Sequence, residues 1–537
     1  MVEKLIRNCK KIVKKVLKIN NDIIYGDFKE ENFSLALKEL VEVNPEIVAI
    51  KKSVGAREDK KEFYPAVKKI EDAFKFYQIK VYEYEDENVP KILEYDGFHS
   101  GTPMKTKPFK PCIKGIKKAL KSKTLFWYPN TVGGNSTRLQ FLKYLEKEGF
   151  NLNPPKGYDK IGVDNIIFTC STTHAFSMIV NLIARAEDVI LLTGPNYGLF
   201  AIEPERMNAR VEILNLKESD DWYVNPKDLS ERIDEINKEL KEKFANKLNY
   251  QPKVVAFLNM NPHNPLGKVM SVKNKDLIEK IGDICLEKGV FVIDDLIYRD
   301  LTFDQDNLAL PMASYPKYFN NTISLFGLSK SYGLASFRAG VVVAPIPICH
   351  GISSQIFQVM DSIPTLQCYS LAGAFNGTPK RYKDAKKYFT PIIKEYKYRF
   401  LLFKALVEGI NSISDEIVKQ KIIKDIYHFE KDKNIRNILL EGIPNVYIKN
   451  KTTPESGFFA IIDFTKLKNK KYKDDIITGE FALLKYLFSK GKIQYIMGMS
   501  MSWPNDDEIV ARINFGIRKK ALINNCKIIN QCVRKLD

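Results

Sequence analysis

Short apolar segments that alternate with helical patterns are the feature of this sequence that most restricts its fold. Five of them lie between residues 166 and 326, and most run into a polar turn: Ile166–Thr169, Val189–Leu192, Val254–Leu258, Val290–Ile293 and Thr322–Phe326. Continuous apolar strands separated by helices are typical of a parallel sheet that is covered on both faces. The sequence therefore predicts an α/β fold built on a mostly parallel sheet.

Polar side chains follow several of these strands. They are Ser171 to Thr173, Tyr197, Asn264, Asp295 with Tyr298, and Lys330. In open parallel sheets, ligands bind at the carboxyl ends of the strands. We therefore expect these residues to face one common site.

Lys330 lies in a small, hydroxyl-rich turn within residues 324–340, and Arg338 follows eight residues later. A deprotonated lysine in such a turn can attack a cofactor aldehyde and form a Schiff base. The alternative is an ordinary solvated lysine in a lysine-rich chain. In the same way, Ser171–Thr173 at a helix start suits a phosphate group, whereas a helix N-cap is the simpler interpretation.

The charge of the chain restricts its partners only weakly. A formal net charge of +19 over 537 residues suits an anionic substrate, a phosphorylated cofactor or nucleic acid. However, lysines alternate with Asp and Glu along most of the chain, which is typical of solvated surfaces. Because the sequence contains no nucleic-acid-binding module, we do not expect nucleic acid as a partner.

The cysteines and histidines predict no metal site. None of the eight cysteines forms a Cys-x-x-Cys pair, and the five histidines are scattered. Free thiols fit a reducing compartment, so we expect a cytoplasmic protein. No apolar stretch reaches 18 residues, and therefore no membrane span is expected.

We expect the chain to divide into three parts. Residues 1–95 would form an N-terminal accessory segment, in which the patterns predict a basic amphipathic helix, a strand at Ile47–Ile50 and an acidic linker at Glu83–Asn88. The basic helix fits either the body of the protein or a membrane surface or targeting role. Residues 96–345 would form a large α/β domain with a leading segment at 96–125. Residues 346–537 would form a smaller α+β domain with a charged helical insertion at about 413–440.

Four motifs in order resemble the fold-type I, class I and II aminotransferases, which use pyridoxal 5′-phosphate. The motifs are N-P-H-N-P-L-G at 261–267, D-L-I-Y at 295–298, Ser329-Lys330 with Arg338, and R-I-N-F-G at 512–516. The resemblance runs from about Asp96 to the C-terminus. It implies a mostly parallel seven-stranded sheet in the large domain, a homodimer with shared sites, and transfer of an amino group between an α-amino acid and a 2-oxo acid.

The resemblance also implies a role for each matching residue. Lys330 would hold the cofactor as a Schiff base and act as the general base, and Asp295 would pair with the pyridine nitrogen. Arg512 would bind the substrate carboxylate through two parallel hydrogen bonds, with Gly101 and Asn264 beside it. Tyr197 would stack on the ring and assist catalysis. Further cofactor contacts would come from Ser171, Thr172, Thr173, Asn264, Tyr298, Ser329, Arg338 and, from the other subunit, Tyr128.

This sequence departs from the family pattern in three ways. Gly327 stands where the family often has a hydroxyl, Thr172 stands where small residues are common, and the chain is longer than usual. Two alternatives stay open on sequence grounds. One is a lyase or decarboxylase with the same cofactor, such as an enzyme like aspartate 4-decarboxylase, and the other is a regulatory protein that keeps the fold without turnover.

Overall fold

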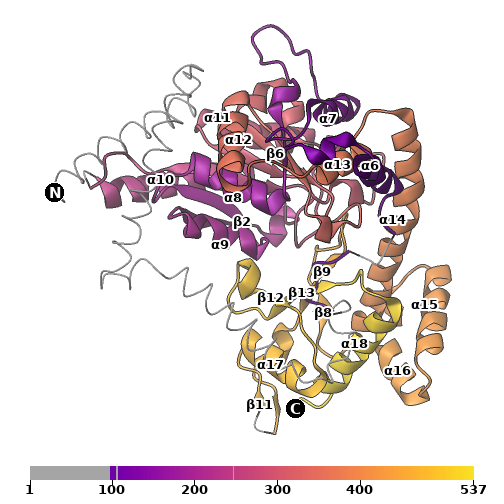
Figure 1. Ribbon diagram of the computed structural model, residues 1–537. Coiled ribbons are helices and arrows are strands. Elements are labelled where there is room, and N and C mark those ends of the chain that lie inside the picture. The colour runs from indigo at the N-terminus through magenta and orange to yellow at the C-terminus, as the bar shows by residue number, and fades with distance from the viewer. Residues whose placement is uncertain (1–96, 104–106, 246, 474) are drawn as a thin grey trace.

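The computed structural model of the protein describes residues 97–103, 107–245, 247–473 and 475–537. The chain forms a larger body around a seven-stranded sheet and a smaller body from its C-terminal part (Figure 1). The helix, strand and linker predicted within residues 1–95 lie outside the described residues. Along the described part of the chain, no helix combines the length and apolar character that a membrane span requires.

The larger body is organised by a sheet with the strand order β1-β7-β6-β5-β4-β2-β3. The pairs from β6 to β3 are parallel, whereas β7 is antiparallel to both β6 and β1. The prediction of a mostly parallel seven-stranded sheet is thus confirmed. The strands are β1 (Ile166–Thr169), β2 (Val189–Gly194), β3 (Arg210–Asn215), β4 (Val254–Met260), β5 (Phe291–Asp295), β6 (Thr322–Gly327) and β7 (Gly340–Val343).

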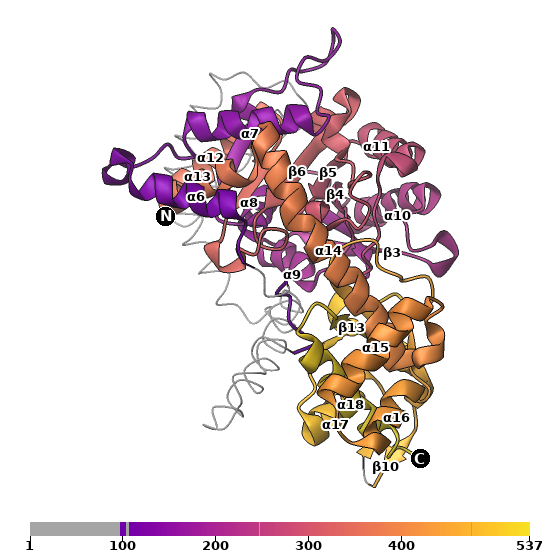
Figure 2. The ribbon, with the colours of Figure 1, turned by 90° about the vertical axis from the view of Figure 1, so that its right-hand side faces the viewer.

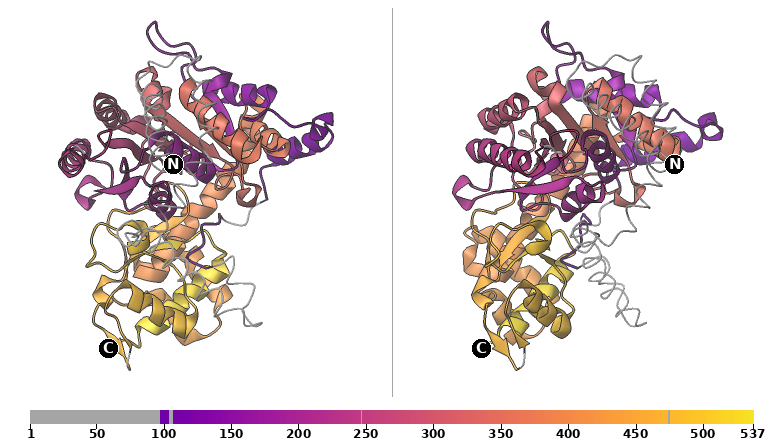
Figure 3. Two further views of the ribbon diagram at one scale, coloured as in Figure 1. Left: turned by 60° about the vertical axis from the view of Figure 1, so that its left-hand side comes forward. Right: turned by 90° about the vertical axis from the view of Figure 1, so that its left-hand side faces the viewer.

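Helices pack on this sheet (Figure 3). The six strands other than β3 are buried along their whole length. Two of the helices, α8 (Thr172–Ile183) and α10 (Pro226–Phe244), begin with a side-chain cap, since the side chains of Ser171 and Asn225 accept hydrogen bonds from backbone N–H groups of the helices that they precede. The helices of this body are α6 (Lys110–Leu120), α7 (Asn135–Lys147), α8 (Thr172–Ile183), α9 (Gly198–Arg206), α10 (Pro226–Phe244), α11 (Lys275–Glu287), α12 (Ile346–Met360) and α13 (Thr365–Ala374).

The smaller body contains a four-stranded antiparallel sheet in the order β12-β13-β9-β8. Its strands are β8 (Tyr447–Ile448), β9 (Phe459–Asp463), β12 (Ile496–Met497) and β13 (Val510–Asn514), and β10 (Lys471–Tyr472) pairs with β11 (Asp475–Ile476). The region expected to be a helical insertion forms α15 (Glu416–Phe429) and α16 (Lys433–Glu441), which bury Ile422, Ile426 and Leu439. The helices α17 (Glu480–Gly491) and α18 (Lys519–Val533) complete this body.

Helix α14 (Pro379–Glu408) has 30 residues and runs from the larger body into the smaller one (Figure 2). It packs on α6 near its start and on α16, α18 and β8 further along. In its second half, Arg399 donates hydrogen bonds to the carbonyl oxygens of Gly516 and Ile517, at 2.7 and 2.6 Å, just after β13.

The domain boundary predicted at residues 345 and 346 stays a prediction. Helix α12 packs on α8 and β1, and α13 packs on α6 and α7, so both helices contact the larger body. We therefore propose a boundary within α14.

Candidate active site

The turn that contains Lys330, called the lysine turn below, follows β6 at the carboxyl edge of the large sheet. The Leu328 N–H donates to the carbonyl oxygen of Ala339 at 3.1 Å, and the Ser331 hydroxyl donates to the Ile297 carbonyl oxygen at 3.2 Å. These bonds tie the turn to the start of β7 and to the segment after β5. Lys330 is a partly buried residue, and its ammonium group donates to the Gly101 carbonyl oxygen at 2.7 Å. The turn is therefore fixed on both sides of Lys330.

Burial and charge alter the titration of Lys330. Loss of solvent, together with the guanidinium groups of Arg512 and Arg338, lowers the Lys330 pKa to about 8, although the Asp295 carboxylate opposes this. Near pH 8 about half of the amine is therefore neutral. A neutral amine is the form that can attack a carbonyl group.

Asp295 ends β5, next to β6 in the sheet. Its carboxylate is buried and accepts a hydrogen bond from the Ile297 N–H at 3.2 Å. Burial raises the Asp295 pKa to about 7, while this hydrogen bond and the Lys330 charge act in the opposite direction. A buried carboxylate with so few donors is suited to a cationic partner.

The adjacent Asp294 differs from Asp295 in its contacts. Its oxygens accept hydrogen bonds from the Asn259 side chain and from the Met312 N–H, both at 2.9 Å. Asp294 is thus used within the fold, and Asp295 is the carboxylate that is available to the site.

Ser171 lies between β1 and α8, and Thr172 and Thr173 are the first two residues of α8. Ser171 has a φ of 109° and caps α8, because its hydroxyl accepts a hydrogen bond from the His174 N–H. The N-cap interpretation is therefore confirmed. Thr173 is exposed at the helix N-terminus, where N–H groups and the helix dipole favour an anion. The two interpretations are compatible.

Two glycines are packed against this segment. A Cβ atom at Gly340 would lie 2.7 Å from the Ser171 carbonyl carbon and 2.9 Å from the Thr172 nitrogen. A Cβ atom at Gly327 would lie 2.6 Å from Ile297 Cδ1 and 3.2 Å from the Thr172 methyl carbon. The two local departures from the family pattern are thus linked, since the Thr172 methyl group occupies the space beside Gly327.

Arg512 lies on β13 and is buried. Its guanidinium group donates to Asn264 Oδ1 at 3.4 Å and to the His99 carbonyl oxygen at 3.3 Å, and lies 4.1 Å from the centre of the Phe459 ring. These contacts hold a cation between the larger and smaller bodies. Arg512 also lowers the Lys330 pKa, so the two groups sense each other's charge.

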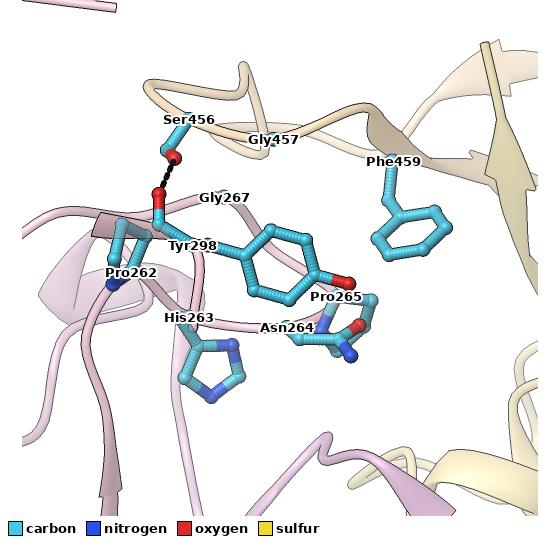
Figure 4. A pocket seen from close by; sticks show the side chains of 9 residues that line it. All are labelled: Pro262, His263, Asn264, Pro265, Gly267, Tyr298, Ser456, Gly457 and Phe459. Carbon is cyan, nitrogen blue, oxygen red and sulfur yellow. Dashed lines mark hydrogen bonds between the residues drawn. The ribbon is translucent and has the colours of Figure 1, made fainter. Parts of the chain in front are cut away.

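A pocket beside Arg512 is formed by the loop after β4, by Tyr298 and by residues 456–459 (Figure 4). In it, the Tyr298 ring extends toward Asn264 and Phe459, while the Ser456 hydroxyl donates to the Tyr298 carbonyl oxygen at 3.3 Å. Tyr298 is buried, which raises the pKa of its phenol. The phenol therefore stays protonated and can donate a hydrogen bond.

The remaining predicted residues lie in different surroundings. Tyr197 is half-buried at the start of α9, and its ring meets that of Phe200 edge to face at 5.5 Å. Ser329 is buried in the lysine turn, whereas Arg338 is exposed and donates to the Ala335 carbonyl oxygen at 2.8 Å. Tyr128 is 89% exposed, so its side chain projects from the surface of this chain.

The sequence interpretation gave no role to Asn514, two residues after Arg512. Its amide nitrogen donates to the carbonyl oxygens of Ser100 and Thr102, at 2.8 and 3.0 Å, and its N–H donates to the Phe98 carbonyl oxygen. Asn514 thus holds the segment that places Gly101 at Lys330. The R-I-N-F-G motif contained the signal, but the sequence alone did not show which backbone this side chain meets.

Comparison with known proteins identifies the family. Residues 98–417, more than half of the chain, match the family "Aminotransferase class I and II". A probable kynurenine–oxoglutarate transaminase of Saccharomyces cerevisiae is 24% identical over 60% of this chain and 64% of its own length. A probable aspartate/prephenate aminotransferase of Aquifex aeolicus is 20% identical over 69% of this chain and 76% of its own length. The chain thus spans just under two thirds of the first relative.

Solved structures support the same fold. The aspartate aminotransferase of Rhizobium meliloti superposes with a TM-score of 0.63 at 13% identity, over 82% of this chain and 91% of that one. The fold is therefore fold type I, and the chain belongs to the class I and II aminotransferase family.

Proposed function

We propose that this family member is a pyridoxal phosphate-dependent aminotransferase, which moves an amino group between an α-amino acid and a 2-oxo acid. One observation carries the proposal: Lys330, with its pKa lowered to about 8, lies within the electrostatic reach of a buried carboxylate, Asp295, and a buried cation, Arg512. An amine, a carboxylate and a carboxylate-binding cation are the three groups that amino-group transfer requires.

The residues present fit the cofactor. Asp295 would hold its ring nitrogen protonated, which explains why a carboxylate is buried there with few donors. The N-terminus of α8, with Ser171, Thr172 and Thr173, would hold the phosphate. Ser329 and Arg338, which are close to Lys330 in the sequence, would contact it as well. Tyr197, Asn264 and Tyr298 would contact the ring. When bound, the cofactor supplies an electron-withdrawing ring that acidifies the substrate Cα–H.

The chain's own residues would perform the other tasks. Arg512 would bind the substrate carboxylate, with Asn264 and Gly101 beside it, and would thereby orient the Cα–H bond for cleavage. Lys330 would take the Cα proton as its neutral amine and return it one step later. Its lowered pKa supports this role, because an ordinary lysine is almost fully protonated at neutral pH.

We also propose a homodimer with shared sites in the cytoplasm. Phe126, Trp127 and Tyr128 are 89, 74 and 89% exposed, respectively, which is unusual for three consecutive aromatic residues. A second copy would cover them, and its Tyr128 would reach the phosphate. The seven described cysteines are free thiols, which supports a reducing compartment.

The test is to add a panel of amino acids, one at a time, to the purified protein with pyridoxal phosphate. We expect a donor amino acid to bleach the visible band of the bound cofactor, and a 2-oxo acid to restore the band. Product release without any 2-oxo acid, at full turnover, would instead indicate a lyase or decarboxylase. If no band forms, or if Lys330→Ala keeps the wild-type band and turnover, the proposal is wrong.

A further inference from the structure

A buried polar network lies next to the lysine turn, at Tyr332. The Tyr332 hydroxyl donates to Asp300 Oδ2 at 2.9 Å and accepts a hydrogen bond from the Arg381 guanidinium at 2.8 Å. Arg381 also lies 3.8 Å from the other Asp300 oxygen. All three side chains are buried, with exposures of 0, 9 and 5% for Tyr332, Asp300 and Arg381. Charge-assisted hydrogen bonds of this kind, shielded from water, are strong and directional.

Tyr332 is two residues after Lys330, and both its backbone and its ring have partners. Its N–H donates to the Leu328 carbonyl oxygen at 3.3 Å, and its own carbonyl oxygen accepts from the Phe109 N–H at 3.2 Å. Its ring packs against those of Phe109, Phe375 and Phe389, with centres 5.2 to 5.4 Å apart. These contacts connect the Tyr332 side chain to the backbone that carries Lys330.

The partners of Tyr332 come from two different elements. Asp300 lies two residues after Tyr298, in the short helical turn Arg299–Leu301 that follows β5 and Asp295. Arg381 lies in the first turn of α14 and is itself fixed, since its Nε donates to the Ala374 carbonyl oxygen at 2.7 Å. The network thus connects the segments that carry Asp295, Tyr298 and Lys330 to the helix that joins the two bodies.

We propose that Asp300 and Arg381 are positioning residues, which act through the Tyr332 hydroxyl to hold the Lys330 turn in place. The inference rests on the proposed role of Lys330 but assigns work to residues that contact neither substrate nor cofactor. A loss of the Tyr332 hydroxyl would leave its ring packing intact and loosen only the polar anchor.

The titration of Lys330 reports on this anchor. Lys330 is faced by Arg512 from β13, by Arg338 from the loop before β7 and by Asp295 from β5, and its pKa is lowered chiefly because it is removed from water. If the turn loosens, water reaches the amine and the two guanidinium groups lie further away on average. Both changes raise the Lys330 pKa toward its ordinary value of 10.5. A purely structural role of the network would lower stability without this change.

The experiment measures the pH dependence of Lys330 acylation in the full-length protein, freed of cofactor, by peptide mass mapping. In the wild type we expect a midpoint near pH 8. In Tyr332→Phe we expect the midpoint to rise by about one pH unit, which reduces the neutral fraction at pH 8 about five-fold. The matched control is Tyr382→Phe, which removes a hydroxyl from the same helix as Arg381. That hydroxyl donates to Glu148 at 2.7 Å and does not contact Tyr332, Asp300 or Arg381 through any hydrogen bond in the described chain.

A raised midpoint in Tyr332→Phe with an unchanged one in Tyr382→Phe supports the proposal. Equal midpoints in wild type and Tyr332→Phe overturn it, whatever happens to thermal stability, and so does an equal rise in both variants. If Tyr332→Phe does not fold, Arg381→Lys and Arg381→Gln are measured in its place. Arg381→Lys, which keeps the charge, should have the wild-type midpoint, and Arg381→Gln should have a raised one. Because acylation needs no cofactor or substrate, this result is independent of whether transamination is found.

Discussion

Replacing Asp295 with asparagine should stabilise the cofactor-free protein and inactivate the enzyme. The buried carboxyl has a pKa of about 7, against 3.8 for an ordinary aspartate. A carboxyl whose pKa is raised by folding is a cost to the folded state whenever it is ionised. The cost is absent below about pH 3.8, grows between the two pKa values and is complete above about pH 7.

The size of this effect follows from the two pKa values. Each pKa unit corresponds to 1.36 kcal/mol, so ionisation of Asp295 costs about 4 kcal/mol at pH 7.5 and about 1.5 kcal/mol at pH 5. Asparagine removes this cost at both values, and the attraction to Lys330 is already contained in it, because that attraction helps to set the Asp295 pKa. The substitution also buries an amide that needs acceptors, at about 1–3 kcal/mol. We expect a net gain of about 1–3 kcal/mol at pH 7.5.

The assay is urea unfolding of the cofactor-free wild type and Asp295→Asn at pH 5 and at pH 7.5. The unfolding free energy of the variant minus that of the wild type should increase by about 2–3 kcal/mol from pH 5 to pH 7.5. With cofactor, turnover should fall at least about 100-fold, or about 3 kcal/mol. Asp294→Asn is the matched control. The Asp294 carboxyl also has a pKa of about 7, but it does not face the site, so this variant should keep the visible band of the bound cofactor. A stability difference that does not change with pH would refute the reasoning.

Three further substitutions test separate parts of the site. Arg512→Lys keeps the charge but loses the planar guanidinium group, so kcat/KM for the donor amino acid should fall about 100-fold in steady-state assays. An unchanged kcat/KM would show that Arg512 does not bind the substrate. Gly340→Ala adds a Cβ atom 2.7 Å from the Ser171 carbonyl carbon and should weaken cofactor binding about ten-fold by visible titration. Gly162→Ala, where a Cβ atom meets nothing within 4 Å, is its control. Asn514→Ala leaves the Ser100 and Thr102 carbonyl oxygens without their donor and should lower the unfolding free energy by about 2–3 kcal/mol in urea; a loss below about 0.5 kcal/mol would contradict the anchoring role.

The core of the fold could be predicted because buried parallel strands are written as continuous apolar runs. Edge strand β3 was missed, since only one of its six residues, Leu214, is buried, and the others include Arg210 and Glu212, which form an ion pair at the surface. The antiparallel direction of β7 was also not predicted. Its run Val341–Val343 is buried on both faces, and such a run has the same pattern in either direction.

The candidate site could be located because its side chains follow the carboxyl ends of strands, which the topology brings to one edge. The roles of Lys330 and Asp295 stay predictions. What the sequence did not indicate are pairings between distant positions. Asp300, Tyr332 and Arg381 come together from three segments, and no local pattern in any segment identifies the other two.

The path of the chain between the two bodies limits how the protein can be divided. Residues 98–102 lie against Asn514 in the smaller body before the chain enters α6, and α14 returns to that body as one continuous helix of about 45 Å. A single cut in the chain therefore does not separate the two bodies, either to express one alone or to exchange it with that of a relative. An insertion of one residue between Arg381 and Arg399 in α14 would turn Arg399 by about 100° relative to Arg381, and so uncouple the β13 end of the site from the lysine turn. Length changes should be accommodated in surface loops, and α14 should resist them.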